Sequence, residues 1–209
     1  MIYSKLEGMA KTARTRTPSA GMETALLDAA ADILDTDGPD ALSVRRIAAA
    51  AGVAPMGVYN HFQSKNGIIE ALFIRGFERL RDALATISDI TDPYDALREG
   101  GRRYRALAVA HPKVYELMFL RTIPGFEPSE HAIEIAAGAF DALVAAVRRA
   151  MAAGVIAEAD PTETAQIIWS NVHGWVSLEL MGLVEDQHDT FDRGCACVLA
   201  GLRPGDNRP

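Results

Sequence analysis

Apolar residues recur every three or four positions along almost the whole chain, with charged and polar residues between them. This spacing is typical of helices that turn one face toward a core, whereas half-buried strands alternate with a period of two. Glycine and proline interrupt the pattern at intervals and mark helix ends. The pattern therefore predicts an all-α protein, with helices near residues 20–36, 43–51, 54–61, 65–88, 93–111, 113–121, 129–153, 161–184 and 189–202.

The first predicted helix has one apolar stripe and a clear end. Its stripe consists of Leu26, Ala29, Ala30, Ile33 and Leu34, which is the i, i+3, i+4 spacing of a helix that faces a core. The sequence Asp-Gly-Pro at 37–39 ends this helix, because glycine accepts a left-handed cap and proline cannot continue a helix.

The next two predicted helices are short and lie close together in the sequence. Ser43 can cap the first, and Pro55 stands at the start of the second, where its missing N–H costs nothing. Between them, Gly52 permits a sharp turn and Val53 can fill the space between the helices. Together they predict a helix-turn-helix, a unit that other helical bundles can also contain.

The side chains of this unit resemble a known family. The resemblance rests on LSVRRIA at 42–48 and AGVAPMGVYNHFQSK at 51–65. These residues are similar to the N-terminal DNA-binding region of the tetracycline-repressor-like (TetR) family of transcriptional regulators. Residues 111–119 and 169–180 in turn resemble one C-terminal subtype, named for a Trp-His-Gly motif. The resemblance implies an all-helical homodimer that binds an inverted-repeat operator, usually represses, and is released by a small molecule.

The resemblance also implies which residues face DNA. Tyr59 matches a tyrosine that contacts the DNA backbone, with a core tyrosine as the alternative, and His61 and Lys65 match further phosphate contacts. Asn60 has the donor and acceptor needed to pair with adenine, and Arg45 could read guanine or bind phosphate. The expected DNA contacts are Arg14, Arg16, Ser43, Val44, Arg45, Ala54, Pro55, Met56, Tyr59, Asn60, His61 and Lys65.

Two positions depart from the family pattern. Ala54 stands where the family often has Ser or Thr, so the recognition helix, expected near residues 54–61, has no side-chain cap, worth roughly 1 kcal/mol. Gly67 stands three places after Ser64, where a capping box would have an acidic residue. Arg14 and Arg16 lie in an N-terminal basic arm that either enters a minor groove or stays in solvent.

The later helices carry aromatic and methionine residues that are typical either of a core or of a ligand pocket between helices. His173 could face such a pocket or orient a helix as a core histidine; Asn171 and Arg121 are further polar candidates. The residues expected to bind a small-molecule effector are Tyr104, Leu107, His111, Tyr115, Met118, Phe119, Phe126, Phe140, Trp169 and His173.

The last two helices are expected to form a four-helix dimer interface with a second copy of the chain, as the resemblance implies. The residues expected there are Ile168, Val172, Val176, Leu180, Cys195, Val198, Leu199 and Leu202. Cys195 and Cys197 are two residues apart and would lie on different faces of a helix, so a disulfide between them is not expected. Two thiols without a disulfide framework fit the reducing cytoplasm.

The net charge of −7 counts at first against DNA binding, since phosphate repels an acidic chain. However, residues 1–87 contain ten basic and ten acidic side chains, so the whole excess of acid comes from residues 88–209. The segment from Ser43 to Lys65 contains three basic side chains and no acidic one. The predicted DNA face is therefore locally basic, and the acids of the first helix should point away from DNA.

Three segments follow from this pattern: a basic arm at 1–19, a helix-turn-helix domain at 20–66, and a ligand-binding and dimerisation domain at 67–209. A ligand-responsive regulator is the leading interpretation. The alternatives are an architectural DNA-binding protein without a ligand and a helical enzyme, for which no nucleophile elbow, P-loop or dinucleotide fingerprint is present. We expect no metal and no cofactor. We also expect no membrane partner, because the longest apolar stretches are too short to span a bilayer.

Overall fold

The computed structural model describes residues 19–120, 123–185 and 189–205, with side chains from residue 21 onward. Within these ranges the chain forms helices and loops without any strand, as the sequence predicts. None of these helices is long and apolar enough to cross a lipid bilayer. The elements are α1 (Ser19–Asp37), η1 (Pro39–Ala41), α2 (Val44–Ala50), α3 (Pro55–Phe62), α4 (Lys65–Ala85), η2 (Thr86–Asp89), α5 (Pro93–Ala110), α6 (Pro112–Phe119), α7 (Glu130–Ala152), α8 (Pro161–Leu180) and α9 (Thr190–Gly201).

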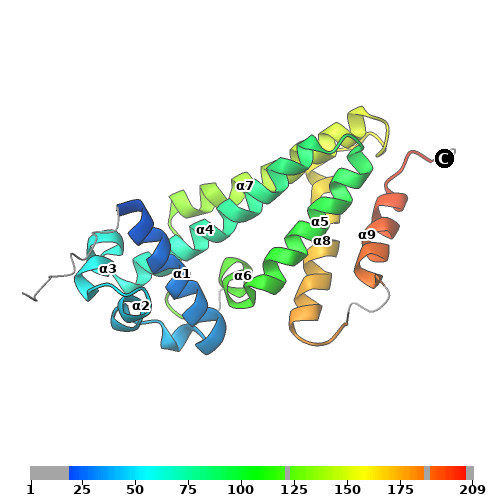
Figure 1. The fold of residues 1–209 in the computed structure, drawn as a ribbon. Coiled ribbons are helices and arrows are strands. Elements are labelled where there is room, and N and C mark those ends of the chain that lie inside the picture. The colour runs from blue at the N-terminus through cyan, green and yellow to red at the C-terminus, as the bar shows by residue number, and fades with distance from the viewer. Residues whose placement is uncertain (1–18, 121–122, 186–188, 206–209) are drawn as a thin grey trace, which may run out of the picture.

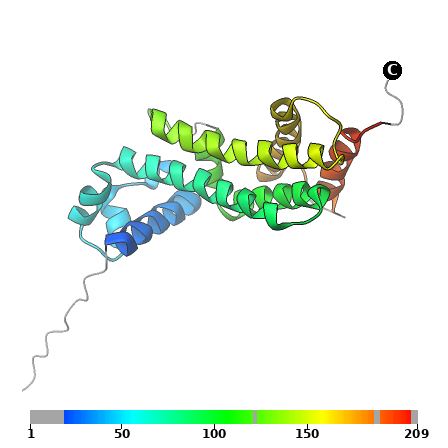
Figure 2. The ribbon, with the colours of Figure 1, turned by 90° about the horizontal axis from the view of Figure 1, so that it is seen from above.

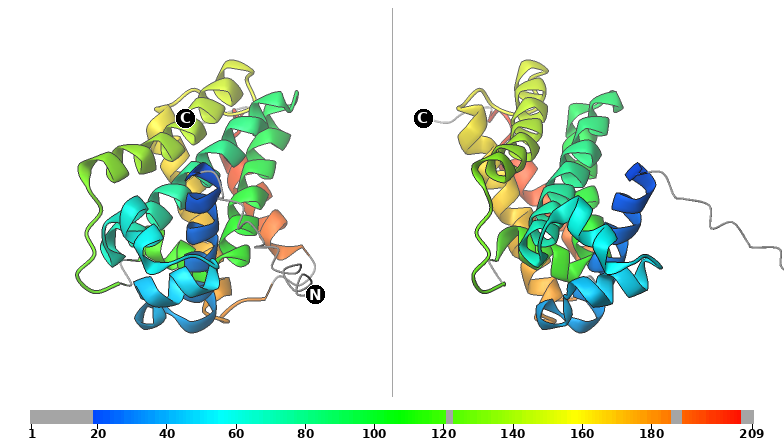
Figure 3. Two further views of the ribbon diagram at one scale, coloured as in Figure 1. Left: turned by 60° about the vertical axis from the view of Figure 1, so that its left-hand side comes forward. Right: turned by 90° about the vertical axis from the view of Figure 1, so that its left-hand side faces the viewer.

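The molecule is elongated, with α1, α2 and α3 gathered at one end and α9 at the other (Figure 1). Helix α4 starts beside α3 and runs along the molecule, with α7 side by side with it (Figure 2). Seen from the end that holds α1–α3, these three helices stand in front of the bundle made by the remaining helices (Figure 3).

The predicted helix ends agree with the observed ones to within a few residues, except at two C-termini. Helix α8 stops at Leu180, four residues before the predicted end, because Gly182 adopts a positive φ of 70° and turns the chain. The fourth predicted helix splits, since α4 ends at Ala85 and Thr86 starts the short 3₁₀ turn η2.

The apolar core continues without a break from α1 to α8. The predicted α1 stripe is buried, with Leu26 and Ala30 fully inaccessible, and it belongs to the same cluster as Tyr115 of α6 and Val176 of α8. A second cluster fills the far end between α5, α7, α8 and α9, around Val147. The core therefore consists of two clusters, one that extends from α1 to α8 and one at the far end of the bundle.

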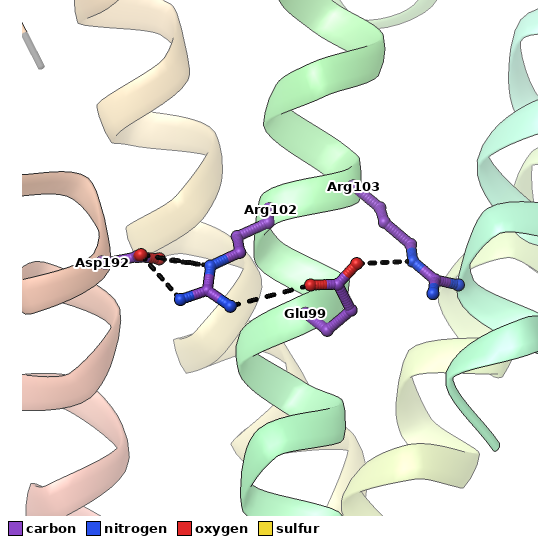
Figure 4. Close-up of polar contacts among 4 residues, drawn as sticks. All are labelled: Glu99, Arg102, Arg103 and Asp192. Atoms are coloured by element: carbon purple, nitrogen blue, oxygen red, sulfur yellow. Dashed lines mark hydrogen bonds and ion pairs between the residues drawn. The ribbon is translucent and has the colours of Figure 1, made fainter. Parts of the chain in front are cut away.

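Helix α9 is held to α5 by a two-pronged ion pair (Figure 4). The Nε and Nη2 atoms of Arg102 lie 2.9 Å and 2.8 Å from the two carboxylate oxygens of Asp192. The same guanidinium lies 3.7 Å from Glu99, which also accepts a 3.0 Å hydrogen bond from Arg103. The hydrogen bond from Arg102 lowers the pKa of the Asp192 carboxyl below its ordinary value.

The variant Asp192→Asn should unfold more easily than the wild type at pH 7, by about 1 kcal/mol or less because the pair is partly exposed. A carboxyl whose pKa is lowered on folding stabilises the protein above its unfolded pKa, and that contribution is lost as the pH falls through the folded pKa. Urea unfolding should therefore show a gap between the two proteins at pH 7 that closes as the pH falls below about 4. The exposed Asp141→Asn is the control. A difference in unfolding free energy that is as large below pH 4 as at pH 7 would contradict the stabilising role of the ionised Asp192 carboxylate.

Candidate nucleic-acid interface and apolar cavity

Helices α2 and α3 form the helix-turn-helix that the sequence predicts. Gly52 adopts the positive φ of 68° that the turn requires. Ser43 caps α2 by accepting a hydrogen bond from the backbone N–H of Arg46 at 3.3 Å. Ala54 precedes α3 without a side-chain cap, as expected, and Pro55 occupies the first turn.

The short helix α3 has one buried face and one exposed face. Val58 and Phe62 enter the core, with exposures of 0% and 8%. Met56, Tyr59 and Asn60 are exposed on the opposite face. Side chains four positions apart lie above one another on a helix, so this exposed face forms a continuous surface. Its exposed tyrosine argues against the alternative of a core tyrosine.

The remaining predicted DNA contacts differ in how exposed their side chains are. Ser43, Arg45, Ala54 and Pro55 are exposed, whereas Val44 and His61 are half-buried. The Nζ atom of Lys65 donates a 3.3 Å hydrogen bond to the backbone carbonyl of Pro39, so this lysine also ties α4 to the loop before α2. An ammonium group has three donors, so two further hydrogen bonds to a phosphate are available to it. Arg14 and Arg16 lie outside the described residues.

Three acidic side chains of α1 are paired with groups on other elements. Asp28 pairs with Arg75 of α4 at 2.7 Å, and Asp35 accepts a 2.7 Å hydrogen bond from the backbone N–H of Lys113. Asp37 forms an ion pair with Arg46. Three of the carboxylates that would repel phosphate therefore already have partners within the chain, with Asp28 and Asp37 still partly exposed.

The start of α4 fits tightly against the end of α3. Ser64 caps α4 by accepting a 3.1 Å hydrogen bond from the backbone N–H of Gly67. A Cβ atom at Gly67 would lie only 1.9 Å from the backbone oxygen of Phe62. The acidic residue of a capping box cannot occupy this position, which explains the departure from that motif.

Helix α4 also runs across the predicted domain boundary at residues 66 and 67.

A cavity of about 290 Å³ lies inside the bundle, between α4, α5, α6, α7 and α8. Its wall is almost entirely apolar. The lining residues are Phe73, Phe77, Leu80, Leu84, Leu97, Gly100, Gly101, Tyr104, Met118, Phe119, Ile133, Ala136, Ala139, Phe140, Leu143, Ile168, Trp169 and Val172.

Five of the ten residues expected to bind an effector line this cavity, namely Tyr104, Met118, Phe119, Phe140 and Trp169. Leu107, His111, Tyr115, Phe126 and His173 do not belong to its wall. Phe126 instead packs on Phe73, with ring centroids 6.0 Å apart, and Leu107 packs against the main core cluster. The polar candidate Arg121 lies outside the described residues.

His111 does not line the cavity, because its side chain lies at the junction between α1 and α6. His111 ends α5, and its Nδ1 lies 3.1 Å from a carboxylate oxygen of Asp35 in α1. The other oxygen of Asp35 accepts the hydrogen bond from Lys113 described above. His111 and the start of α6 are therefore attached to the helix-turn-helix region rather than to the cavity.

Tyr115 and His173 lie behind Tyr104 in a buried polar cluster. The Tyr104 and Tyr115 hydroxyls lie 2.8 Å and 2.7 Å from Nδ1 of His173, and 3.3 Å from each other. The indole N–H of Trp169 donates to the Tyr104 hydroxyl at 3.3 Å. Burial raises the pKa of both tyrosines and lowers the pKa of His173, so every member of the cluster is neutral at pH 7.

Lining residues that the sequence did not reveal come from α4, α5, α7 and α8, with four each on α4 and α7. Phe73, Phe77, Leu80 and Leu84 recur at helical spacing, a signal that is present in the sequence but equally typical of a core. The adjacent Gly100 and Gly101 of α5 were a better clue, since two glycines inside a helix indicate a close approach or open space.

Five of the eight residues predicted at the dimer interface are buried within this chain. Ile168, Val172, Val176, Cys195 and Leu199 are at most 7% exposed and lie in its core. Leu180, Val198 and Leu202 are half-buried. On α8 the predicted stripe is the one that faces inward, and the large apolar residues Ile167, Leu178 and Met181 are exposed on another face. Burial raises the pKa of the Cys195 thiol to about 11, so it stays protonated at pH 7.

Within the described ranges, no three His, Cys, Asp or Glu side chains converge in a way that could hold a metal ion.

Comparison with known proteins links both halves of the chain to one family. Residues 26–72 match the model of bacterial regulatory proteins of the tetR family, and residues 97–198 match the model of the tetracyclin repressor-like C-terminal domain. The chain belongs to the TetR family of transcriptional regulators. The first of these segments holds the helix-turn-helix, and the second holds most of the helices around the cavity.

Two relatives of this TetR-family regulator are named HTH-type transcriptional regulators. The chain is 30% identical over 99 residues to the HTH-type transcriptional regulator AlkX of Mycobacterium tuberculosis, a stretch that covers 46% of this chain and about half (47%) of AlkX. It is 25% identical over 169 residues to another HTH-type transcriptional regulator of that organism, covering 81% of this chain and 75% of the relative.

Solved structures share the fold over nearly the whole length. A protein of unknown function from Rhodococcus sp. RHA1 superposes with a TM-score of 0.78 at 25% identity, covering 93% of this chain and all of that one. The TetR-family transcriptional regulator PfmR from Thermus thermophilus superposes with a TM-score of 0.65 at 22% identity, covering 88% of this chain and 99% of that one.

The variant Gly67→Ala of this regulator should be destabilised by about 1–3 kcal/mol, because the new methyl group would collide with the carbonyl of Phe62. It should also weaken DNA binding, since α3 would have to shift to relieve the collision. The exposed neighbouring variant Asn66→Ala is the matched control. Thermal unfolding and a DNA titration test both, and a Gly67→Ala protein with wild-type stability would contradict the packing of α3 on α4.

Proposed function

We propose that this TetR-family regulator is a repressor that binds an inverted-repeat operator as a homodimer and is released by a small molecule in the α4–α8 cavity. The observation that carries the proposal is that α4 belongs to both sites. Its first turn packs against the end of α3 at Gly67, and its middle lines the cavity through Phe73, Phe77 and Leu80. A change in the cavity therefore acts directly on the helix that positions α3.

Two further contacts support this coupling. A Cβ atom at Gly76 of α4 would lie 2.5 Å from Sδ of Met118, a cavity residue on α6. The side chain of Met118 is thus wedged between the cavity and α4. At its other end, α6 is tied to α1 through Asp35. A ligand that displaces Met118 would push α4 and α6 apart and move both supports of the helix-turn-helix.

The cavity also favours a ligand-responsive protein over an architectural DNA-binding protein. Protein interiors leave few voids larger than a water molecule, because packing contributes to stability. An apolar space of about 290 Å³, near the lower end of the range for ligand pockets, is therefore a feature that needs an occupant.

The proposed homodimer uses the outer face of α8. Ile167, Gly174, Leu178 and Met181 follow one another at intervals of seven, four and three residues, which places them on one helix face, and the three large side chains are 42–61% exposed. Space is open around Gly174, where a Cβ would meet nothing within 4 Å, so a partner helix can approach closely. These residues replace the buried stripe as the proposed interface.

The Trp-His-Gly subtype stays a prediction that rests on Trp169, His173 and Gly174. Action on chromosomal DNA in the cytoplasm follows from the proposed role and is part of the same proposal.

Selection of duplexes from a random pool should yield an inverted repeat. On that operator, Asn60→Ala should lose preference at one base position in each half-site, with a cost of about 1–3 kcal/mol for the correct base. Its exposed neighbour Tyr59 provides the control, because Tyr59→Phe should weaken binding equally for all sequences. Titrations against single-base variants of the repeat test this, and uniform weakening by Asn60→Ala would contradict a base-reading role.

The variant Leu178→Glu should shift the protein from dimer to monomer at micromolar concentration, because it would place two charges in an apolar interface. Ala145→Glu, at an exposed position of α7 outside the proposed interface, should leave the mass unchanged. Sedimentation equilibrium measures both, and a Leu178→Glu dimer as stable as the wild type would exclude this face.

A further inference from the structure

We propose that the α4–α8 cavity selects an uncharged ligand that is mainly hydrocarbon, and that it rejects the corresponding carboxylate. At the packing density of protein interiors, a cavity of about 290 Å³ holds a molecule of about ten to fifteen non-hydrogen atoms. This inference names the ligand class for the cavity of the proposed function and therefore rests on that function.

The wall contains no charged side chain. Among the lining residues, only Tyr104 and Trp169 have polar side-chain atoms, and all the others are aliphatic, aromatic, methionine or glycine. A buried carboxylate or ammonium group that finds no partner costs far more than a neutral polar group. A charged ligand would therefore lose its hydration without compensation.

The two polar groups on the wall already have hydrogen-bond partners. Because burial lowers its pKa, His173 is neutral and offers one acceptor when Nδ1 carries no proton. Tyr115 then donates to Nδ1, Tyr104 donates to the Tyr115 hydroxyl, and Trp169 donates to the Tyr104 hydroxyl. In this arrangement all three donors are used, so none is left for a carboxylate, whereas the Tyr104 oxygen can still accept a bond from an alcohol.

Three guanidinium groups on the helices around the cavity already have carboxylate partners. On the helices that form the cavity, Arg75 pairs with Asp28 at 2.7 Å, and Arg103 pairs with Glu99 at 3.0 Å. Arg105 has a two-pronged pair with Glu179 of α8. An anionic ligand that recruited one of these groups would have to break an ion pair and leave a carboxylate behind.

Two exposed carboxylates lie near Ile133, the most exposed lining residue of the cavity. Ile133 is 51% exposed, so the cavity reaches the surface beside the first turns of α7, where His131 lies 4.0 Å from Glu134. Glu130 lies one turn before Ile133 on the same helix face, and Glu134 follows it directly; both are exposed. Negative charge at an opening repels anions as they approach.

The experiment compares 1-decanol with decanoate, which has the same number of carbon atoms, at pH 7.5 and below the concentration at which micelles form. Binding is followed by the fluorescence of Trp169 in the variant Trp175→Phe. Trp175 Nε1 is buried without a hydrogen-bond partner, so this substitution removes no hydrogen bond. The variant Trp169→Phe, which keeps only Trp175, should give little signal.

The expected result is that 1-decanol binds at least about 100-fold more tightly than decanoate, the effect of an uncompensated buried charge. Shortening the alcohol to 1-octanol should weaken binding about fifteenfold, because two methylene groups leave the apolar wall. Decanoate that binds as tightly as 1-decanol would overturn the proposal, as would equal affinity for both alcohols.

A matched pair of variants locates the site. Ala136→Leu fills part of the cavity and should weaken 1-decanol at least about tenfold, whereas Ala137→Leu, the same change at the exposed neighbour, should leave the affinity unchanged. Unchanged affinity in Ala136→Leu would also overturn the proposal. Tight binding of 1-decanol that leaves operator binding intact would support the ligand class and contradict the proposed effector role, so the two failures are distinguishable.

Discussion

The packing of one continuous helix, α4, is the constraint on which the rest of the structure depends. Its start fits under the end of the recognition helix with no room for a side chain at Gly67, and its middle forms a wall of the cavity. A helix of 21 residues moves largely as a rigid body. The orientation of α3 and the shape of the cavity are therefore set by the same element.

The helical fold and the helix-turn-helix could be predicted from sequence because their signals are local. The turn at Gly52, the cap at Ser43 and the stripe that begins at Leu26 each depend on neighbours within a few residues. The buried and exposed faces of α3 followed in the same way, since a helix of eight residues has only one way to bury Val58 and Phe62 together.

The cavity and the outer face of α8 could not be predicted with the same success, because they depend on how long helices pack. An apolar stripe shows that a face is buried but not by which partner, so Ile168 and Val172 were expected between subunits and lie within one. His111 has the chemistry of a pocket residue, and only the approach of α1 reveals its bond to Asp35. In each case the missing information was a contact between residues that are far apart in the sequence.

The central claim is that the cavity and the DNA-binding face are coupled through α4, and thermodynamic linkage tests it most directly. The affinity of the protein for its operator is measured with and without saturating 1-decanol, and the affinity for 1-decanol is measured with and without operator. Coupling predicts that each ligand weakens the other by the same factor, on the order of 5- to 150-fold. Factors of one in both directions, with 1-decanol bound in the cavity, would contradict the claim.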